Sequence, residues 1–162
     1  MFTAHIRKDG VEQPVEQHLS SVSTLCDQFG SKLALSHLSR LIGALHDLGK
    51  YTAEFNQYIH YSHLHPNDHS LKGKIPHSLQ GALYLCERFH SGSQPSRTAI
   101  AAALCIASHH SGLMDCISPI GELPFYQNAD VAPHAGAWIE IGLVCASLPI
   151  VLSLPTRERG LK

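Results

Sequence analysis

Hydrophobic residues recur at helical spacing in the first part of the chain. Intervals of three and four residues place side chains on one face of an α-helix. Residues 15–29 follow this pattern, and Gly30 is placed to end that helix. A second stripe runs from Leu35 to Leu48, with Ser31 as a candidate N-cap and Gly49 at the C-terminal turn. The first stripe consists of Val15, Leu19, Val22, Leu25, Cys26 and Phe29.

Three further helices are predicted before residue 112. The first covers residues 51–61, the second begins near His77 and runs to Phe89, and the third begins near Arg97 and ends at residues 109–110. Polar, Gly- and Pro-containing segments separate them, at residues 60–76 and 91–96.

The pattern changes after Gly112. Residues 113–137 contain three prolines and show no clean period, and the apolar stretch 138–154 is broken by Gly142 and Pro149. We therefore predict an all-α helical bundle over residues 1–112 and a poorly defined C-terminal segment over residues 113–162.

The unusual feature of the composition is its histidine content. The chain has 162 residues, 44% of them hydrophobic, which suits one domain with a real core. Its formal net charge is −1, so net charge gives no case for nucleic-acid binding, and a local patch or a partner would have to supply a positive field. The 13 histidines equal Asp and Glu combined, which favours metal or acid-base chemistry.

The cysteines and the N-terminus bear on the compartment. The five cysteines are odd in number and lack C-x-x-C spacing, so we interpret them as small buried hydrophobes in a reducing environment. The N-terminus has no continuous apolar core typical of a signal peptide, and no uncharged run is long enough to span a membrane. We expect a cytoplasmic protein without membrane contact.

Residues of metal-binding type stand near the ends of the predicted helices, about one helix and one loop apart. Such spacing brings ligands from several helices to one centre inside a bundle, and imidazole and carboxylate are usual ligands of Zn, Mn, Fe, Co and Ni. The set consists of His18, His46, Asp47, His77, His109 and His110.

The adjacent pairs in this set favour two ions rather than one. Neighbouring residues on a helix point about 100° apart, so His46 and Asp47 readily serve two ions with Asp47 bridging them. Dinuclear sites with metals roughly 3.5–4 Å apart hydrolyse phosphoesters. Lys50, three residues after Asp47, falls on the same helical face and could contact a phosphate oxygen or hold a water. No P-loop, H-E-x-x-H helix or Ser-His-Asp arrangement competes.

The remaining histidines receive no metal role. His60, His63, His65 and His69 lie in a polar loop, which we interpret as solvated in preference to a second metal cluster. We assign no function to the four others, which are His5, His37, His90 and His134.

The ordered motifs resemble the HD-type nuclease domain of CRISPR-associated helicase-nucleases of type I systems, over about residues 10–113. They are E-Q-H-L at 16–19, H-D-L-G-K at 46–50, H-S-L-Q-G-A at 77–82 and S-H-H-S-G at 108–112. The resemblance implies an all-α domain with two divalent transition-metal ions that cuts single-stranded DNA. It also implies a surveillance complex that exposes this DNA and a helicase partner that delivers it.

By the same resemblance the six residues above are metal ligands, with Asp47 bridging and Lys50 supporting the phosphate. Imidazole ligands favour Mn, Co, Ni or Fe over Mg, with Zn as a further candidate. The family carries a late aspartate that completes the ligand set, and only Asp115 and Asp130 follow His110 here.

Two questions stay open from sequence. Residues 131–140 look like a translated CRISPR direct repeat, so residues 113–162 are either read-through from a truncated reading frame or a divergent C-terminal helix. For function, the alternatives to a nuclease are an HD phosphohydrolase acting on nucleotides and a truncated, inactive metal-binding remnant.

Overall fold

The computed structural model describes residues 1–89, 97–110 and 112, and these residues form a mostly helical fold. Five α-helices, one 3₁₀-helix and a short β-hairpin follow one another along the described chain. The predicted all-α bundle is confirmed, and the hairpin is an addition to it. The predictions for residues 90–96 and 113–162, including the two interpretations of the tail, lie outside the described residues.

The first helix, α1 (Val15–Ser31), begins directly after Pro14, as predicted. Val15 and Leu19 of its apolar stripe are buried, whereas Phe29 is exposed. The N-terminal part of the stripe therefore enters the core, and its C-terminal end lies at the surface.

The connection between α1 and α2 differs from the prediction. Ser31 is the last residue of α1, and α2 (Ser36–Leu45) begins only after a short turn. The carbonyl of Gly30 accepts hydrogen bonds from the backbone N–H groups of Leu33 (3.0 Å) and Leu35 (2.9 Å). The prediction that Ser31 caps α2 is wrong, because these backbone bonds carry the chain past Ser31 before the next helix starts.

The α2 helix ends earlier than predicted. The helix ends at Leu45, Asp47 has φ −116° and ψ 28°, and a 3₁₀-helix, η1 (Leu48–Tyr51), follows. The single predicted helix is therefore two elements joined at His46 and Asp47. In a 3₁₀-helix, side chains three residues apart eclipse one another, which favours contact between Asp47 and Lys50.

The remaining helices largely match the prediction. The α3 helix (Ala53–Leu64) is capped by Thr52, whose hydroxyl accepts a hydrogen bond from the N–H of Phe55 at 3.2 Å. The α4 helix (Leu79–Phe89) starts two residues after His77, which leaves His77 in the irregular segment before the helix. The α5 helix (Arg97–Ser108) begins where expected.

A short hairpin at the N-terminus was not predicted. Strands β1 (Thr3–Ile6) and β2 (Glu12–Pro14) pair antiparallel. The backbone N–H of Thr3 donates to Asn56 Oδ1 on α3 at 3.0 Å, which ties β1 to that helix. The pattern did not predict these strands because they are only four and three residues long, too short for an alternation to stand out.

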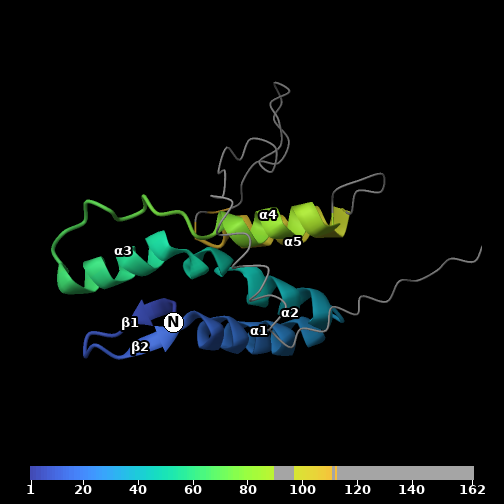
Figure 1. Ribbon diagram of the computed structural model, residues 1–162. Coiled ribbons are helices and arrows are strands. Elements are labelled where there is room, and N and C mark those ends of the chain that lie inside the picture. Colours follow the sequence, from blue (N-terminus) through green and yellow to red (C-terminus); the bar gives the residue numbers. More distant parts are fainter. Residues whose placement is uncertain (90–96, 111, 113–162) are drawn as a thin grey trace, which may run out of the picture.

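The helices pack as two pairs around the segment that follows α2. In Figure 1, α1 lies along α2, α4 lies along α5, and α3 lies above the hairpin. The side chains of Leu19, Leu48, Leu85 and Ile106 are almost fully buried and come from α1, η1, α4 and α5. The core thus meets at η1, directly beside His46 and Asp47.

The structure bears on two further predictions, the burial of the cysteines and the absence of a membrane span. Cys86 is buried as expected, but Cys105 is exposed and Cys26 is half-buried, so burial of the cysteines holds only in part. Among the described residues, every helix is too short or too polar to cross a lipid bilayer.

Candidate metal centre

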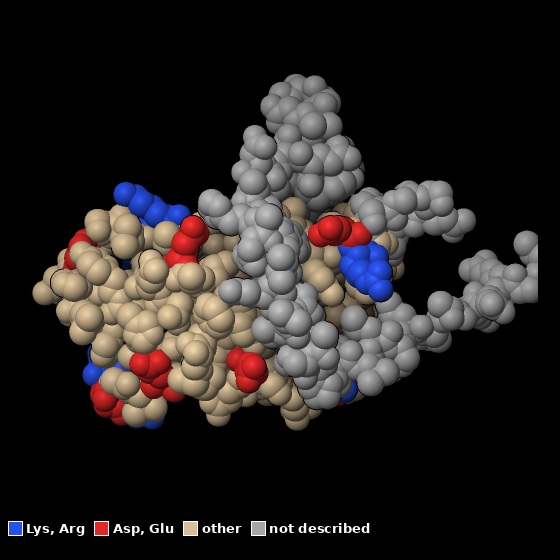
Figure 2. All heavy atoms as spheres, viewed as in Figure 1, with Lys and Arg blue, Asp and Glu red and all other residues tan. Residues whose placement is uncertain are grey.

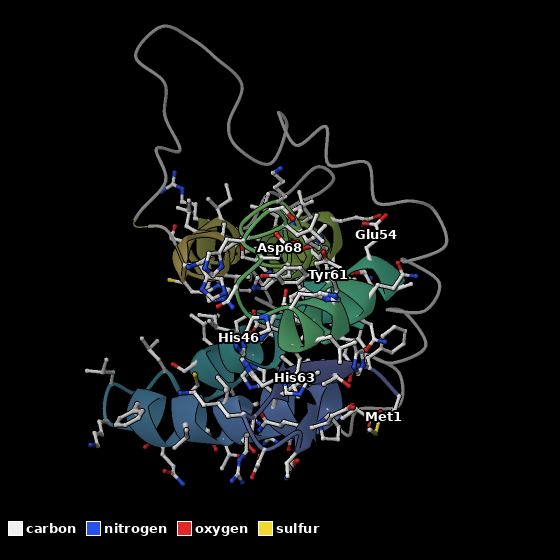
Figure 3. The ribbon with its side chains drawn as sticks, turned by 90° about the vertical axis from the view of Figure 1, so that its left-hand side faces the viewer. Met1, His46, Glu54, Tyr61, His63 and Asp68 are labelled. Atoms are coloured by element: carbon white, nitrogen blue, oxygen red, sulfur yellow. The ribbon has the colours of Figure 1, made fainter. Side chains whose placement is uncertain are left out.

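The six residues singled out from the sequence converge on one carboxylate. Asp47 is buried, with 3% of its surface exposed, at the junction between α2 and η1. Imidazoles from α1, from the segment before α4 and from the end of α5 reach it across long stretches of sequence. In Figure 3, His46 lies in the interior, between α1 and the α4–α5 pair.

One oxygen of this carboxylate, Oδ2, faces two imidazoles and an ammonium group. His18 Nε2 lies 2.9 Å from Oδ2, and His46 Nε2 lies 3.1 Å from it. The two Nε2 atoms lie 3.1 Å apart. Lys50 Nζ lies 2.9 Å from the same oxygen.

The other oxygen, Oδ1, faces three imidazoles. His109 Nε2 lies 3.2 Å from Oδ1, and the Nε2 atoms of His77 and His110 each lie 3.8 Å from it. The Nε2 atoms of His77 and His110 lie 2.9 Å apart. The five imidazoles are thus divided between the two oxygens of one side chain.

The turn after α2 explains how adjacent residues share this centre. On a regular helix the side chains of His46 and Asp47 would point about 100° apart. Asp47 leaves helical geometry, and its Oδ2 lies 3.1 Å from Nε2 of His46. His109 and His110 likewise follow the end of α5, and their ring centroids lie 4.0 Å apart.

Two glycines let the segments approach closely. A β-carbon added at Gly49 would stand 2.6 Å from the α-carbon of His77, and one added at Gly81 would overlap the carbonyl of Leu45. Each distance is shorter than real β-carbons tolerate. The glycine of H-D-L-G-K therefore admits the His77 segment, and the glycine of H-S-L-Q-G-A admits the end of α2.

Backbone carbonyls fix three of the imidazoles in one orientation. His46 Nδ1 lies 2.8 Å from Gly43 O, and His109 Nδ1 lies 2.6 Å from Ile106 O. His77 Nδ1 lies 3.3 Å from the carbonyl oxygen of Ile75. A carbonyl only accepts, so each Nδ1 donates, and in the neutral ring Nε2 then carries the lone pair.

The Nε2 lone pairs point at the negatively charged carboxylate of Asp47. With Nδ1 protonated, neutral His46 and His109 each aim an Nε2 lone pair at an oxygen of Asp47. Two acceptors at about 3 Å repel one another unless a cation, either a proton or a metal ion, stands between them. Hydrogen bonding of the far ring nitrogen to a carbonyl is the usual arrangement of metal-ligating histidines. The donor set therefore fits a transition-metal site.

The charge state of Asp47 agrees with this fit. Burial raises the pKa of Asp47, but when a proton is the cation, the Nε2–H groups of His109, His18 and His46 donate hydrogen bonds that outweigh burial and hold the pKa well below its ordinary value. The pKa of His109 is raised, chiefly by its hydrogen bond to Asp47. The carboxylate is therefore ionised at neutral pH and attracts cations.

The pKa values of His77 and His110 are lowered, in contrast to that of His109. Burial lowers the pKa of His77, and burial together with the neighbouring His109 lowers the pKa of His110. Both rings are accordingly neutral near pH 7, which is the form that binds a metal ion.

The ligand atoms form three overlapping triads whose members all include Asp47. Within each triad the ligand atoms lie within 4.8 Å of one another. Nitrogen and oxygen ligands bind transition metals at roughly 2.0–2.2 Å, so two neighbouring ligands of one ion lie about 3 Å apart. The triads are His5–His18–Asp47, His46–Asp47–His109 and Asp47–His77–His110.

His5 is the member that sequence analysis missed. It lies on β1, and its ring packs edge-on against His18 with centroids 4.8 Å apart. Burial, followed by the charge of Lys50, lowers its pKa. No sequence signal marked it, because the hairpin that brings it to the centre was itself not predicted.

The other histidines of the described chain lie away from this cluster. His63, His65 and His69 are exposed on α3 and the loop after it, and His60 Nδ1 lies 3.9 Å from Glu12. The part of the chain that the structure describes has no group of metal-binding residues in this loop. The exposure of His63, His65 and His69 agrees with the interpretation of these residues as solvated. The prediction that the loop begins at residue 60 is wrong, because α3 continues to Leu64 and carries His60 and His63. Asp115, Asp130, His90 and His134 lie outside the described residues.

The comparison with protein families agrees with the motifs. The family model described as "Cas3, HD domain" matches residues 10–118, which is more than half of the chain, and so confirms the resemblance found from the motifs. No curated protein matches the chain. The family implies an association with the CRISPR system. The chain belongs to the Cas3 HD domain family, which makes it a CRISPR-associated HD phosphohydrolase or nuclease domain with a histidine- and aspartate-rich metal-binding cluster.

Proposed function

We propose that this domain is a metal-dependent endonuclease that cleaves single-stranded DNA in CRISPR antiviral defence. It uses two divalent transition-metal ions, and a helicase subunit or domain delivers the DNA that a surveillance complex exposes. The domain acts in the cytoplasm without membrane contact. Residues 1–112 carry this activity, and residues 113–162 form a separate C-terminal segment.

The division of five imidazoles between the two oxygens of Asp47 is the observation that carries this proposal. His18 and His46 face Oδ2, while His77, His109 and His110 face Oδ1. A carboxylate with nitrogen ligands on both oxygens is suited to bridge two ions. Paired metals suit phosphodiester cleavage, because both the attacking and the leaving oxygen need stabilisation.

The residues of this chain have distinct tasks in the proposal. His18, His46, Asp47, His77, His109 and His110 hold the ions, with Asp47 bridging. Divalent ions bound here supply Lewis-acid activation of water and neutralise charge on the phosphate. The burial of Asp47 keeps bulk water from the bridge and strengthens its electrostatic attraction for cations.

The chemistry of the donors favours particular metals. Imidazole nitrogens suit Mn²⁺, Co²⁺, Ni²⁺ and Fe²⁺, and also Zn²⁺, whereas Mg²⁺ prefers oxygen ligands and retains its water. Five nitrogen donors against one carboxylate therefore predict weak support of activity by Mg²⁺.

The surface charge explains the need for a partner. The face shown in Figure 2 carries separate acidic and basic spots on its described residues, with most of that area neither acidic nor basic. The whole chain has a net charge of −1. Since phosphate contacts dominate affinity for DNA, the positive field that holds the strand comes from the helicase in our proposal.

The experiment is a cleavage assay on circular single-stranded DNA. The purified chain is incubated with Mn²⁺, Co²⁺, Ni²⁺ or Mg²⁺, and Asp47→Ala serves as the inactive control. We expect Mn²⁺, Co²⁺ or Ni²⁺ to support endonucleolytic cutting, Mg²⁺ to support less, and double-stranded circles to be spared. Cleavage that persists in Asp47→Ala would contradict the assignment of the site.

The same assay separates the rival functions. Hydrolysis of nucleoside triphosphates or monophosphates with long single strands spared would favour a nucleotide phosphohydrolase. Less than one bound ion per chain, together with no cleavage with any metal, would favour an inactive remnant.

A further inference from the structure

The ammonium group of Lys50 is enclosed. Lys50 has 3% of its surface exposed and is among the few charged residues buried in the described chain. Its Nζ lies 2.9 Å from Asp47 Oδ2, 3.1 Å from His5 Nε2 and 3.4 Å from the carbonyl oxygen of Ala4. An ammonium group has three N–H donors, and here each has an acceptor.

We propose that Lys50 and His5 are positioning residues: Lys50 fixes the bridging carboxylate of Asp47, and His5 fixes Lys50. This inference rests on the proposed function and replaces the phosphate contact that the family resemblance implies for Lys50. Neither side chain contacts DNA or the reacting atoms.

The hydrogen-bond count argues against a phosphate contact. A phosphate oxygen would have to displace one of three acceptors that already surround Nζ. Nζ also stands over the Phe55 ring, 5.5 Å from its centre, in a cation–π contact. The 3₁₀ turn of η1 places Lys50 beside Asp47, three residues earlier, so the contact is built into the local backbone.

The role of His5 follows from its partner. Lysine only donates, so the Nε2 of His5 accepts, and His5 is the neutral ring protonated on Nδ1. Two of the three acceptors of Lys50, the Ala4 carbonyl and His5, lie on β1. The hairpin thus reaches the centre through Lys50, and the contact of Thr3 with Asn56 on α3 anchors the strand.

The effect on the ions comes through the orientation of the carboxylate. Asp47 must present both oxygens to ligand positions, and a hydrogen bond to Oδ2 limits rotation of the carboxylate about its last bond. Loss of such outer partners typically lowers metal affinity or activity by about 10–100-fold.

A direct metal role for His5 is the main competing assignment, since His5, His18 and Asp47 form one of the three triads. Its Nε2 lone pair, however, already accepts from Lys50 at 3.1 Å, and a cation bound there would stand against the ammonium charge. The contact with Lys50 therefore favours the positioning role.

The experiment measures Mn²⁺ affinity without DNA, by electron paramagnetic resonance, beside kcat and KM for single-stranded DNA. The variants are His5→Leu, which removes the acceptor, His5→Gln, which restores one, Lys50→Met, the double variant His5→Leu/Lys50→Met, and Asp47→Ala. Circular dichroism and melting without metal confirm that each variant is folded.

We expect His5→Leu and Lys50→Met to weaken Mn²⁺ binding by about 10–100-fold while KM for DNA stays the same. His5→Gln should bind within about threefold of the wild type, because the glutamine carbonyl replaces Nε2. The double variant should bind no more weakly than Lys50→Met alone, since His5 acts through Lys50.

Each other outcome overturns the inference. A higher KM for DNA with unchanged Mn²⁺ affinity in Lys50→Met would restore the phosphate contact. Equal losses in His5→Leu and His5→Gln, or a further loss in the double variant, would make His5 a ligand. If His5→Leu binds Mn²⁺ as tightly as the wild type while Asp47→Ala binds it poorly, this inference is overturned and the proposed function stands. Absence of Mn²⁺ binding by the wild type itself overturns the proposed function as well.

Discussion

Gly81 of α4 lies against the backbone of Leu45, the last residue of α2, so closely that a β-carbon at Gly81 would overlap the Leu45 carbonyl oxygen. The residue after Leu45 is His46, so this contact fixes the point at which the chain leaves α2 and enters the metal centre. The contact joins two motifs that are remote in sequence, and it explains why one of them contains glycine.

We predict that Gly81→Ala destabilises the fold by about 1–3 kcal/mol or more, because the added methyl group meets backbone rather than a flexible side chain. Urea unfolding measures the loss. Gly73→Ala is the control: Gly73 has φ +75° but open space around its α-carbon, so it reports backbone strain without a clash. A smaller loss for Gly81→Ala than for Gly73→Ala would contradict the close approach.

A second prediction concerns the anchor beside Asp47. The side chain of Leu48 is fully buried where the helices meet, so Leu48→Ala should cost about 2–5 kcal/mol of unfolding free energy through lost contacts and the cavity left behind. Leu64→Ala is the matched control, since Leu64 is 72% exposed and its substitution should change stability by less than about 0.5 kcal/mol. Similar losses in the two variants would show that η1 is not part of the core.

The sequence predicted the helices well where their patterns were long and periodic. The α1 stripe begins at Val15, and the start of α5 at Arg97 agrees with the prediction. The convergence of six remote residues also followed from their positions at helix ends, because helices of a bundle begin and end in shared layers.

The local path of the chain at Asp47 could not be predicted in the same way. Helical periodicity carries on through Leu48, yet the backbone leaves the helix at Asp47, because burial of Leu48 and Tyr51 stabilises η1 instead. His5 was missed for a related reason. Its role depends on a hairpin of two short strands that is held by tertiary contacts such as that of Thr3 with Asn56.

A third prediction concerns pH and the loop that leads to His77. Tyr61 donates a hydrogen bond to Asp68 at 2.6 Å, and Figure 3 shows the two side chains together. This bond, with that from the Ser70 backbone, lowers the pKa of Asp68 to about 2. A lowered carboxyl pKa contributes stability above the ordinary value of 3.8, and this contribution is lost as the pH falls through about 2.

Tyr61→Phe should therefore raise the pKa of Asp68 part of the way towards 3.8. Carboxyl ¹³C chemical shifts measure it, over the pH range in which the circular dichroism stays native. Tyr58→Phe, on the same helix, should leave the Asp68 titration unchanged. A midpoint for Asp68 near 3.8 already in the wild type would contradict the contact.

The last prediction tests the division of imidazoles between the two oxygens of Asp47. If the oxygens belong to separate ion sites, a variant on one side should lose one ion and keep the other. His110 faces Oδ1 and has the most exposed side chain of the five imidazoles, so His110→Gln disturbs the core least. We expect the wild type to bind two Mn²⁺ ions with a spin-coupled paramagnetic resonance signal.

In His110→Gln the coupled signal should give way to that of a single ion, with affinity for the second lowered by at least about tenfold, because one nitrogen ligand is lost. Asp47→Asn should lose both ions, since it removes the shared negative charge. His37→Gln, at an exposed position of α2, should match the wild type. Binding of one ion by the wild type, or equal loss of both ions in His110→Gln, would show that the carboxylate serves a single metal.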